Sequence, residues 1–264
     1  MAKLKSILVK GMAVATTCAF LLPIGKAHAA ADQYEVKVFA DADKVVKDNR
    51  HIDHDILEKL GSEDKDENFN VQYIDDQNES NHQNGVTYRV RKSENDDTHK
   101  YQYKKRYPIE NGNVDAAINQ AKADGFDGDE FEVEYGENKQ TLSVTKESEE
   151  DLNLDGTELP NASDSLKSLK SFASSPYDAL LNKINDPKAV GPVHFERHKG
   201  KIDDNNVKIE NWEIGNKNVV ELSAKVNTES EAKAVQQSIV NKLDNLDIHE
   251  TQDQLKTDLI FSIY

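Results

Sequence analysis

The chain has 264 residues, of which 31% are charged and 36% are hydrophobic, and its formal net charge at pH 7 is −16. A protein this acidic is not expected to track along nucleic acid or to lie on an anionic membrane surface. The charges are mixed in sign and interspersed with apolar residues, which argues against wholesale disorder and predicts a folded core.

Residues 1–29 have the three parts of a cleavable secretory signal peptide. Three lysines give a positive start, an apolar run follows at residues 11–24, and two alanines precede a cut before Ala30. The apolar run is too short for a helix that spans a bilayer. We therefore predict that the leader is removed on export and that residues 30–264 form one domain with no membrane attachment.

The same leader carries the only cysteine, so the secreted protein has no disulfide and must be stabilised by its core. The leader is rich in lysine, and the chain has neither a good lipidation site nor a cell-wall anchor. We interpret this style of export as release from a Gram-positive bacterium. No feature of the sequence predicts an oligomeric state.

Alternation of apolar and polar residues is typical of half-buried β-strands. It recurs, in chain order, at residues 33–39, 69–74, 86–91, 100–107, 131–135 and 219–226. Less regular patterns predict further strands at residues 141–145, 193–198, 207–214 and 258–264. The sequence therefore predicts about ten strands.

Helical spacing of apolar residues occurs between the strands. It predicts helices, in chain order, at residues 43–60, 113–124, 163–173, 176–184 and 229–243. Asn113 is placed to cap the second of these helices, and Thr228 with Glu231 forms a capping box for the last. Strands mostly in hairpins, with helices inserted between them, indicate an α+β fold with an antiparallel sheet.

The polar faces of the predicted strands carry charges rather than neutral side chains. The basic faces hold Lys37, Arg89, Arg91, Lys104, Arg106 and Lys225, and the acidic faces hold Glu35, Glu132, Glu134, Glu213 and Glu221. For any single strand the simpler interpretation is a charged side in solvent, paired across strands. Taken together, the strands suggest a sheet that curls until the charged faces meet in a polar tunnel. Such a tunnel suits a condensed phosphate chain, because Arg and Lys hold phosphate oxygens and carboxylates hold a divalent cation.

The first strand, Gln33-Tyr34-Glu35-Val36-Lys37, resembles the Glu-x-Glu-x-Lys signature of the CYTH, or triphosphate tunnel metalloenzyme, superfamily. The resemblance continues through an Arg-x-Arg strand, a lysine-bearing strand, a strand of alternating glutamates, a late basic residue and two closing strands with glutamates. These features are carried by Arg89 and Arg91, Lys104, Glu132 and Glu134, Arg197, and Glu213 and Glu221. Each motif is short, but their order spans most of the chain after the leader.

The resemblance implies an antiparallel, closed or nearly closed, tunnel-like barrel of eight to ten strands with helices packed outside. It implies phosphate binding by Lys37, Arg89, Arg91, Lys104, Arg106, Arg197 and Lys225. It implies that Glu35, Glu134, Glu213 and Glu221 bind Mg²⁺ or Mn²⁺, and that Glu35, Lys37 and Glu134 are catalytic. Members of the family hydrolyse triphosphate compounds or form cyclic AMP from ATP.

Two positions depart from the family pattern. Gln33 stands where the signature has its first glutamate, and Ser223 stands where members often carry a second acid near Glu221. The favoured hypothesis is a secreted, metal-dependent hydrolase of triphosphate or polyphosphate compounds, with a small phosphorylated substrate or a polyanion as its partner. The alternatives are a non-catalytic extracellular protein that binds a polyanion or another ligand on the same scaffold, and a surface or interaction protein whose sheet has a charged face.

Overall fold

The computed structural model describes residues 31–48, 50–63, 66–126 and 128–264, so the predicted signal peptide lies outside the described residues. In chain order the elements are β1 (Gln33–Ala40), α1 (Ala42–Val45), α2 (His54–Lys59), β2 (Asp66–Asp76), α3 (Ser80–Gln83), β3 (Val86–Ser93), β4 (His99–Pro108), the 3-10 turn η1 (Glu110–Gly112), α4 (Val114–Ala123), β5 (Glu130–Tyr135), β6 (Gln140–Glu150), α5 (Ala162–Phe172), α6 (Tyr177–Leu181), β7 (Pro187–Ile202), β8 (Asn205–Ile214), β9 (Lys217–Val226), α7 (Glu229–Asn245), β10 (His249–Glu250) and α8 (Lys256–Ile263).

Nine of the ten strands close into a barrel in the order β1-β5-β6-β4-β3-β2-β7-β8-β9, and β9 pairs back onto β1. Neighbouring barrel strands are antiparallel except β1 and β5, which are parallel. The predicted closed barrel is confirmed, with one parallel pair that was not predicted. A ring with an odd number of strands requires at least one such pair, because strand direction cannot alternate all the way round.

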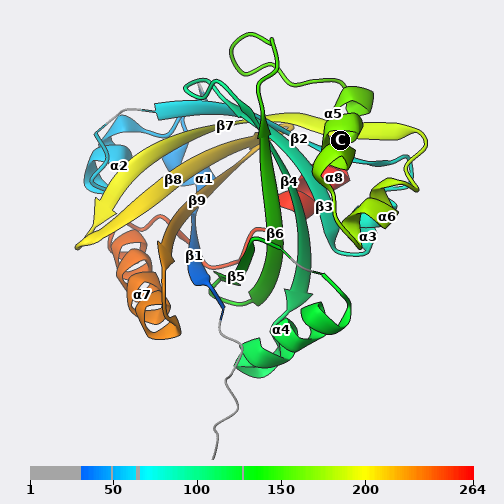
Figure 1. Cartoon of the computed structure of the whole chain (residues 1–264). Coiled ribbons are helices and arrows are strands. Elements are labelled where there is room, and N and C mark those ends of the chain that lie inside the picture. Colours follow the sequence, from blue (N-terminus) through cyan, green and yellow to red (C-terminus); the bar gives the residue numbers. More distant parts are fainter. Residues whose placement is uncertain (1–30, 49, 64–65, 127) are drawn as a thin grey trace, which may run out of the picture.

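Helices cover the outer face of the barrel (Figure 1). The outward side chain of Val38 on β1 lies in one buried cluster with Val235 and Ile239 of α7. On the side of β3 and β4, Tyr88 lies in a second cluster with Leu169 of α5. No helix in the described part of the chain is both long and apolar enough to cross a membrane.

The helix predicted at residues 43–60 is wrong. The chain forms two short helices, α1 and α2, separated by an antiparallel bridge between Val46 and Ile52. The carboxylate of Asp53 accepts the backbone N–H of Asp55 and so caps the start of α2. A capping residue does not have the helical backbone conformation. The helix is therefore interrupted before α2, although the apolar residues of this segment keep a helical spacing across the interruption.

The strand predicted at residues 258–264 is also wrong, because this segment forms most of helix α8. The barrel is already closed, so a strand here would meet no free edge, whereas a helix satisfies its own backbone hydrogen bonds. In Figure 1, α8 lies behind β3 and β4. Its Ile260 and Phe261 are buried in a cluster with Phe39 and Tyr73, which point inward from the strands, so α8 fills one end of the barrel.

Part of the barrel interior is apolar, contrary to the expectation that apolar faces point outward. The inward rings of Phe69 on β2, Phe195 on β7 and Trp212 on β8 stack in a row, with centroids 4.5 Å and 4.0 Å apart. The register places them opposite one another on adjacent strands. The interior is thus divided between an aromatic wall, formed by β2, β7 and β8 with α8, and a charged wall, formed by β1, β3, β4 and β5.

Candidate functional site

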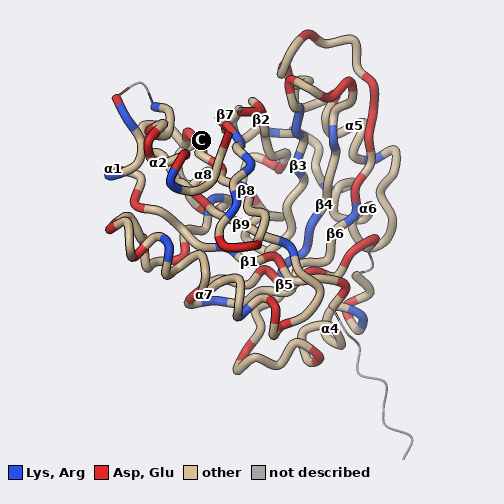
Figure 2. Tube along the Cα trace, turned by 90° about the vertical axis from the view of Figure 1, so that its left-hand side faces the viewer, with Lys and Arg blue, Asp and Glu red and all other residues tan. Residues whose placement is uncertain are grey.

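Charged side chains from strands that are far apart in sequence gather inside the barrel. Figure 2 shows basic segments along β3 and β4, and β5 carries glutamates at alternate positions. Side-chain alternation fixes which residues share the inner face of each strand. The register then brings Glu35 of β1 beside Glu134 of β5 on one side and beside Lys225 of β9 on the other.

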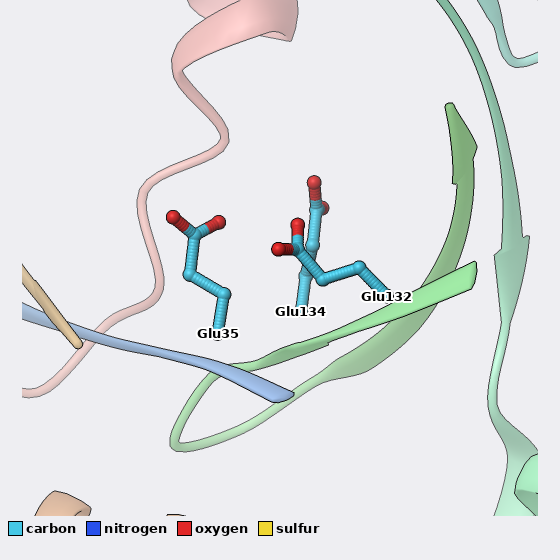
Figure 3. Close-up of side chains that lie close together, drawn as sticks. All are labelled: Glu35, Glu132 and Glu134. Atoms are coloured by element: carbon cyan, nitrogen blue, oxygen red, sulfur yellow. The ribbon is translucent and has the colours of Figure 1, made fainter. Parts of the chain in front are cut away.

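Three carboxylates converge at the centre of the charged wall. Oxygen atoms of Glu35, Glu132 and Glu134 all lie within 4.8 Å of one another. Figure 3 shows these side chains pointing toward one another from β1 and β5. They offer only oxygen donors, the type that Mg²⁺ and Mn²⁺ prefer, so the residues present fit either ion.

The carboxylate of Glu134 is surrounded by cations. Its oxygens lie 2.8 Å from Lys104 Nζ, 3.2 Å from Arg106 Nε and 3.4 Å from Lys37 Nζ. Burial acts to raise the pKa of Glu134, but these three cations hold it well below the ordinary value. Glu134 therefore stays ionised and fixes the position of three basic side chains.

The surroundings shift the pKa values of Glu35 and Glu132 in opposite directions. Burial acts to raise the pKa of Glu35, but Lys37 and Lys104 outweigh it and lower that pKa to about 2. Burial, followed by the neighbouring Glu35 carboxylate, raises the pKa of Glu132 in spite of Lys225 Nζ at 2.5 Å. A cation bound at the cluster would therefore stabilise the ionised form of Glu132 more than the ionised forms of Glu35 and Glu134.

The two arginines of β3 face the tunnel without a carboxylate partner. Among the described residues, no carboxylate lies within ion-pair distance of Arg89 or Arg91. Burial, with repulsion from Arg89 and Arg197, lowers the pKa of Arg91 to about 10. A guanidinium held in this way lacks the anion that ordinarily accompanies a buried charge. An anionic ligand beside β3 would supply the missing partner.

Charges on the other side of the interior are already paired. Arg197 Nη2 lies 2.8 Å from Glu210 Oε1, and the indole N–H of Trp212 donates to Glu210 Oε2 at 2.9 Å. Lys256, from the start of α8, places its Nζ 2.9 Å from Glu221 Oε2 and 3.5 Å from Glu210 Oε2. These contacts join β7, β8, β9 and α8 into one buried ionic network.

The structure brings most of the predicted site residues together. Those on the inner face are Glu35, Lys37, Arg89, Arg91, Lys104, Arg106, Glu134, Arg197, Glu221 and Lys225. Glu213 does not join them. It lies on the outer face of β8, where Arg50 Nε is 3.1 Å away, because alternation directs residues 208, 210 and 212 inward instead.

Sequence reasoning missed three residues of the tunnel as site residues. Glu132 shares the face of Glu134, and that alternation was signal enough to add it to the metal set. Glu210 shares a face with Trp212, but it belongs to none of the motifs that carry the resemblance in sequence. Lys256 carries no local signal, because its place depends on α8 entering the barrel.

Two cavities open from the interior, at opposite ends of the strands. One of about 310 Å³ lies beside α8 and is lined in part by Lys37, Arg106, Glu134, Glu221 and Lys256. The other, of about 860 Å³, lies at the ends of β7, β8 and β9. Its charged lining consists of five basic residues, Arg197, Lys199, Lys201, Lys208 and Lys225, and three acids, Glu63, Asp66 and Glu67. We call the second cavity the basic mouth.

Comparison with known proteins finds similarity in structure alone. No family model matches the chain, and no curated protein matches it. A candidate adenylyl cyclase from Hippeastrum, with a dominant triphosphatase activity, superposes with a TM-score of 0.55 over 86% of this chain and 94% of its own, at 11% identity. A candidate adenylate cyclase from Bacillus halodurans gives a TM-score of 0.51 over 86% of this chain and 96% of its own, at 13% identity.

These identities are low, so the likeness establishes the fold and not the activity. The fold is the CYTH-like tunnel barrel that the resemblance in sequence implies. The similarity also extends over nearly the full length of both solved structures, so the barrel is matched as a whole.

Proposed function

We propose that the tunnel binds the triphosphate group of a small phosphorylated compound together with a divalent cation, and hydrolyses it. One observation carries the proposal. Two arginines without carboxylate partners, Arg89 and Arg91, face the same interior as the carboxylates of Glu35, Glu132 and Glu134. Unpaired guanidinium groups and clustered carboxylates are what a complex of phosphate and metal requires.

In this proposal each charged side chain has a role. Arg89 and Arg91 hold phosphate oxygens, and Lys37, Lys104 and Arg106 neutralise the phosphate nearest the carboxylates. Glu35, Glu132 and Glu134 hold Mg²⁺ or Mn²⁺. Such an ion would neutralise charge on the phosphate group and make the phosphorus easier for water to attack.

The reaction is an ordinary phosphoanhydride hydrolysis. A water molecule adds to the terminal phosphorus, and the bond from that phosphorus to the bridging oxygen breaks. The bond's electrons remain on the diphosphate that leaves, and the proton of the water passes to a carboxylate of the cluster. The side chains supply charge and position, which is most of what this reaction needs.

The fold supports the proposal, because one solved structure that shares it has a dominant triphosphatase activity. The leader at residues 1–29 supports export of the remaining chain, residues 30–264, as one secreted domain of a Gram-positive bacterium. The inward direction of the charges speaks against an interaction protein with a charged outer face.

A second candidate is a binding protein without catalysis. Two contacts favour it. The amide of Gln33 donates to Glu130 rather than supplying a carboxylate to the cluster, and Glu221 is occupied by Lys256. A tunnel with fewer free carboxylates could hold the polyanion but not turn it over.

The test is phosphate release from tripolyphosphate with added Mg²⁺ or Mn²⁺. We expect release by the wild type and a loss of about 100-fold or more in Glu35→Gln, because a charge that acts in the transition state is removed. Glu213→Gln, on the outer face of the barrel, is the matched control and should keep full activity. Binding of tripolyphosphate by calorimetry without release would select the second candidate, and neither binding nor release would overturn both.

A further inference from the structure

Two lysines at the basic mouth lie opposite each other on neighbouring strands. Lys199 on β7 and Lys208 on β8 are direct cross-strand partners. Both side chains are exposed and line the cavity of about 860 Å³. Among the described residues, no carboxylate lies within ion-pair distance of either lysine.

Such a pair works against the fold. Like charges placed directly opposite on neighbouring strands are destabilising. Partial burial of the side chain, followed by the nearby Arg197, lowers the pKa of Lys208, whereas Glu35 and Glu210 act to raise it. The mouth is lined by five basic residues and three acids in a chain with a net charge of −16, and this local excess of positive charge indicates a place for an anion.

The basic mouth is continuous with the centre of the tunnel. Lys225 lines the mouth, and its Nζ reaches the carboxylate of Glu132 at 2.5 Å. Arg197 also lines the mouth, and its guanidinium lies over the ring of Phe69 at 4.4 Å. Arg91 lies over the same ring at 5.4 Å. Cationic side chains therefore extend from the mouth to Arg91, one of the two arginines of β3 that have no carboxylate partner among the described residues.

The shape of the interior selects the kind of anion. Helix α8 occupies much of the far end of the barrel and leaves a cavity of about 310 Å³ beside it, against about 860 Å³ at the mouth, so the mouth is the wider entrance for a ligand. The residues described as lining the mouth include no aromatic side chain, so a nucleobase would find no ring on which to stack. A chain of phosphates alone needs only the cations.

We propose that the protein takes the end of a linear inorganic polyphosphate, and that Lys199 and Lys208 bind phosphates beyond those held in the tunnel. The inference rests on the proposed function, since the end of the chain occupies the triphosphate site. It adds a second subsite outside that site and names a substrate longer than a triphosphate.

Calorimetry in EDTA, which prevents turnover, tests the subsite with two probes: tripolyphosphate and a linear polyphosphate several times longer. The wild type should bind the longer chain more tightly. The double variant Lys199→Gln/Lys208→Gln should weaken binding of the longer chain by roughly threefold to tenfold and leave tripolyphosphate within about twofold. Its affinity for the longer chain should also depend less steeply on salt.

The matched control is Lys167→Gln/Lys170→Gln, which removes two exposed lysines from the outer helix α5 and should change neither affinity. A mouth variant that weakens both probes equally, or neither, overturns the inference. Equal binding of oligothymidylate of the same charge overturns it as well, because the mouth would then accept any polyanion. Failure of both probes to bind the wild type, in EDTA and again with Mg²⁺ in place of EDTA, would instead overturn the proposed function.

Discussion

The charged wall and the aromatic wall both hold buried charge, but they treat it differently. On the charged wall, Arg89 and Arg91 have no carboxylate within ion-pair distance among the described residues. On the aromatic wall, Arg197 and Lys256 are bound to Glu210 and cover aromatic rings. Arg197 and Lys256 already have a carboxylate partner within the protein, whereas Arg89 and Arg91 would obtain an anionic partner from a bound ligand. The first kind should matter for folding and the second for binding.

The largest expected effect lies on the aromatic wall. Arg197→Met leaves Glu210 buried without its nearest cation and should lower the free energy of unfolding by about 3 kcal/mol, as measured by urea denaturation. The double variant Arg197→Met/Glu210→Gln should recover much of this loss, because the stranded carboxylate is gone. Wild-type stability in Arg197→Met would mean that the pair does not support the fold, and the contrast between the walls would fail.

Arg91 should show the reverse behaviour. Arg91→Met removes a buried charge that has no carboxylate partner, so the free energy of unfolding should be unchanged or slightly higher. Binding of tripolyphosphate should weaken by about 10-fold to 100-fold, because a hydrogen bond to a charged group is lost. Calorimetry and urea denaturation of the same variant separate the two effects. A destabilisation as large as that of Arg197→Met would show that Arg91 also serves the fold.

The smallest effect concerns the outer side of the aromatic wall. Burial acts to raise the pKa of Glu196, but His198, His51 and Asn211 outweigh it and lower that pKa to about 2. Glu196 Oε2 lies 2.7 Å from His51 Nδ1, and Glu196 in turn raises the pKa of His51. These contacts tie the segment between α1 and α2 to β7.

The sign of the pH dependence follows from these two shifts. Because the pKa of Glu196 is lowered, its contribution to stability is fully present above about pH 4.5 and is lost as the pH falls through about 2. Because the pKa of His51 is raised, its contribution to stability is fully present below about pH 6.5 and is lost as the pH rises through the raised pKa. Glu196→Gln should therefore cost about 1–2 kcal/mol between pH 4.5 and 6.5, and less on either side. Urea denaturation across this range checks it, and a pH-independent difference would contradict it.

The repeating parts of the fold could be read from the sequence. Alternation located the strands, and the predicted caps are present, with Asn113 accepting the N–H of Ala116 and Thr228 forming a capping box with Glu231. These features depend on neighbours within a few residues. The break between α1 and α2 was missed because apolar spacing does not show whether Asp53 lies inside a helix or caps one.

The site was predictable to the extent that alternation fixes which residues share a face. Glu35 with Lys37, and Arg89 with Arg91, share their faces by spacing alone. Alternation does not say which face turns inward, so the inward direction of Phe69 was missed. The place of Lys256 could not be predicted, because it depends on a barrel that closes first and leaves room at one end.

That last segment carries a practical consequence. Besides the Lys256 ion pairs, the carboxylate of Asp253 accepts backbone N–H groups of Asn138 and Lys139, both at 2.8 Å, and the hydroxyl of Tyr264 accepts the N–H of Gly215 at 3.2 Å. Residues 253–264 therefore occupy one end of the barrel and supply a cation, Lys256, to the acids inside it. Removing them to shorten the protein would widen the opening at this end of the barrel and leave Glu221 without its ion-pair partner.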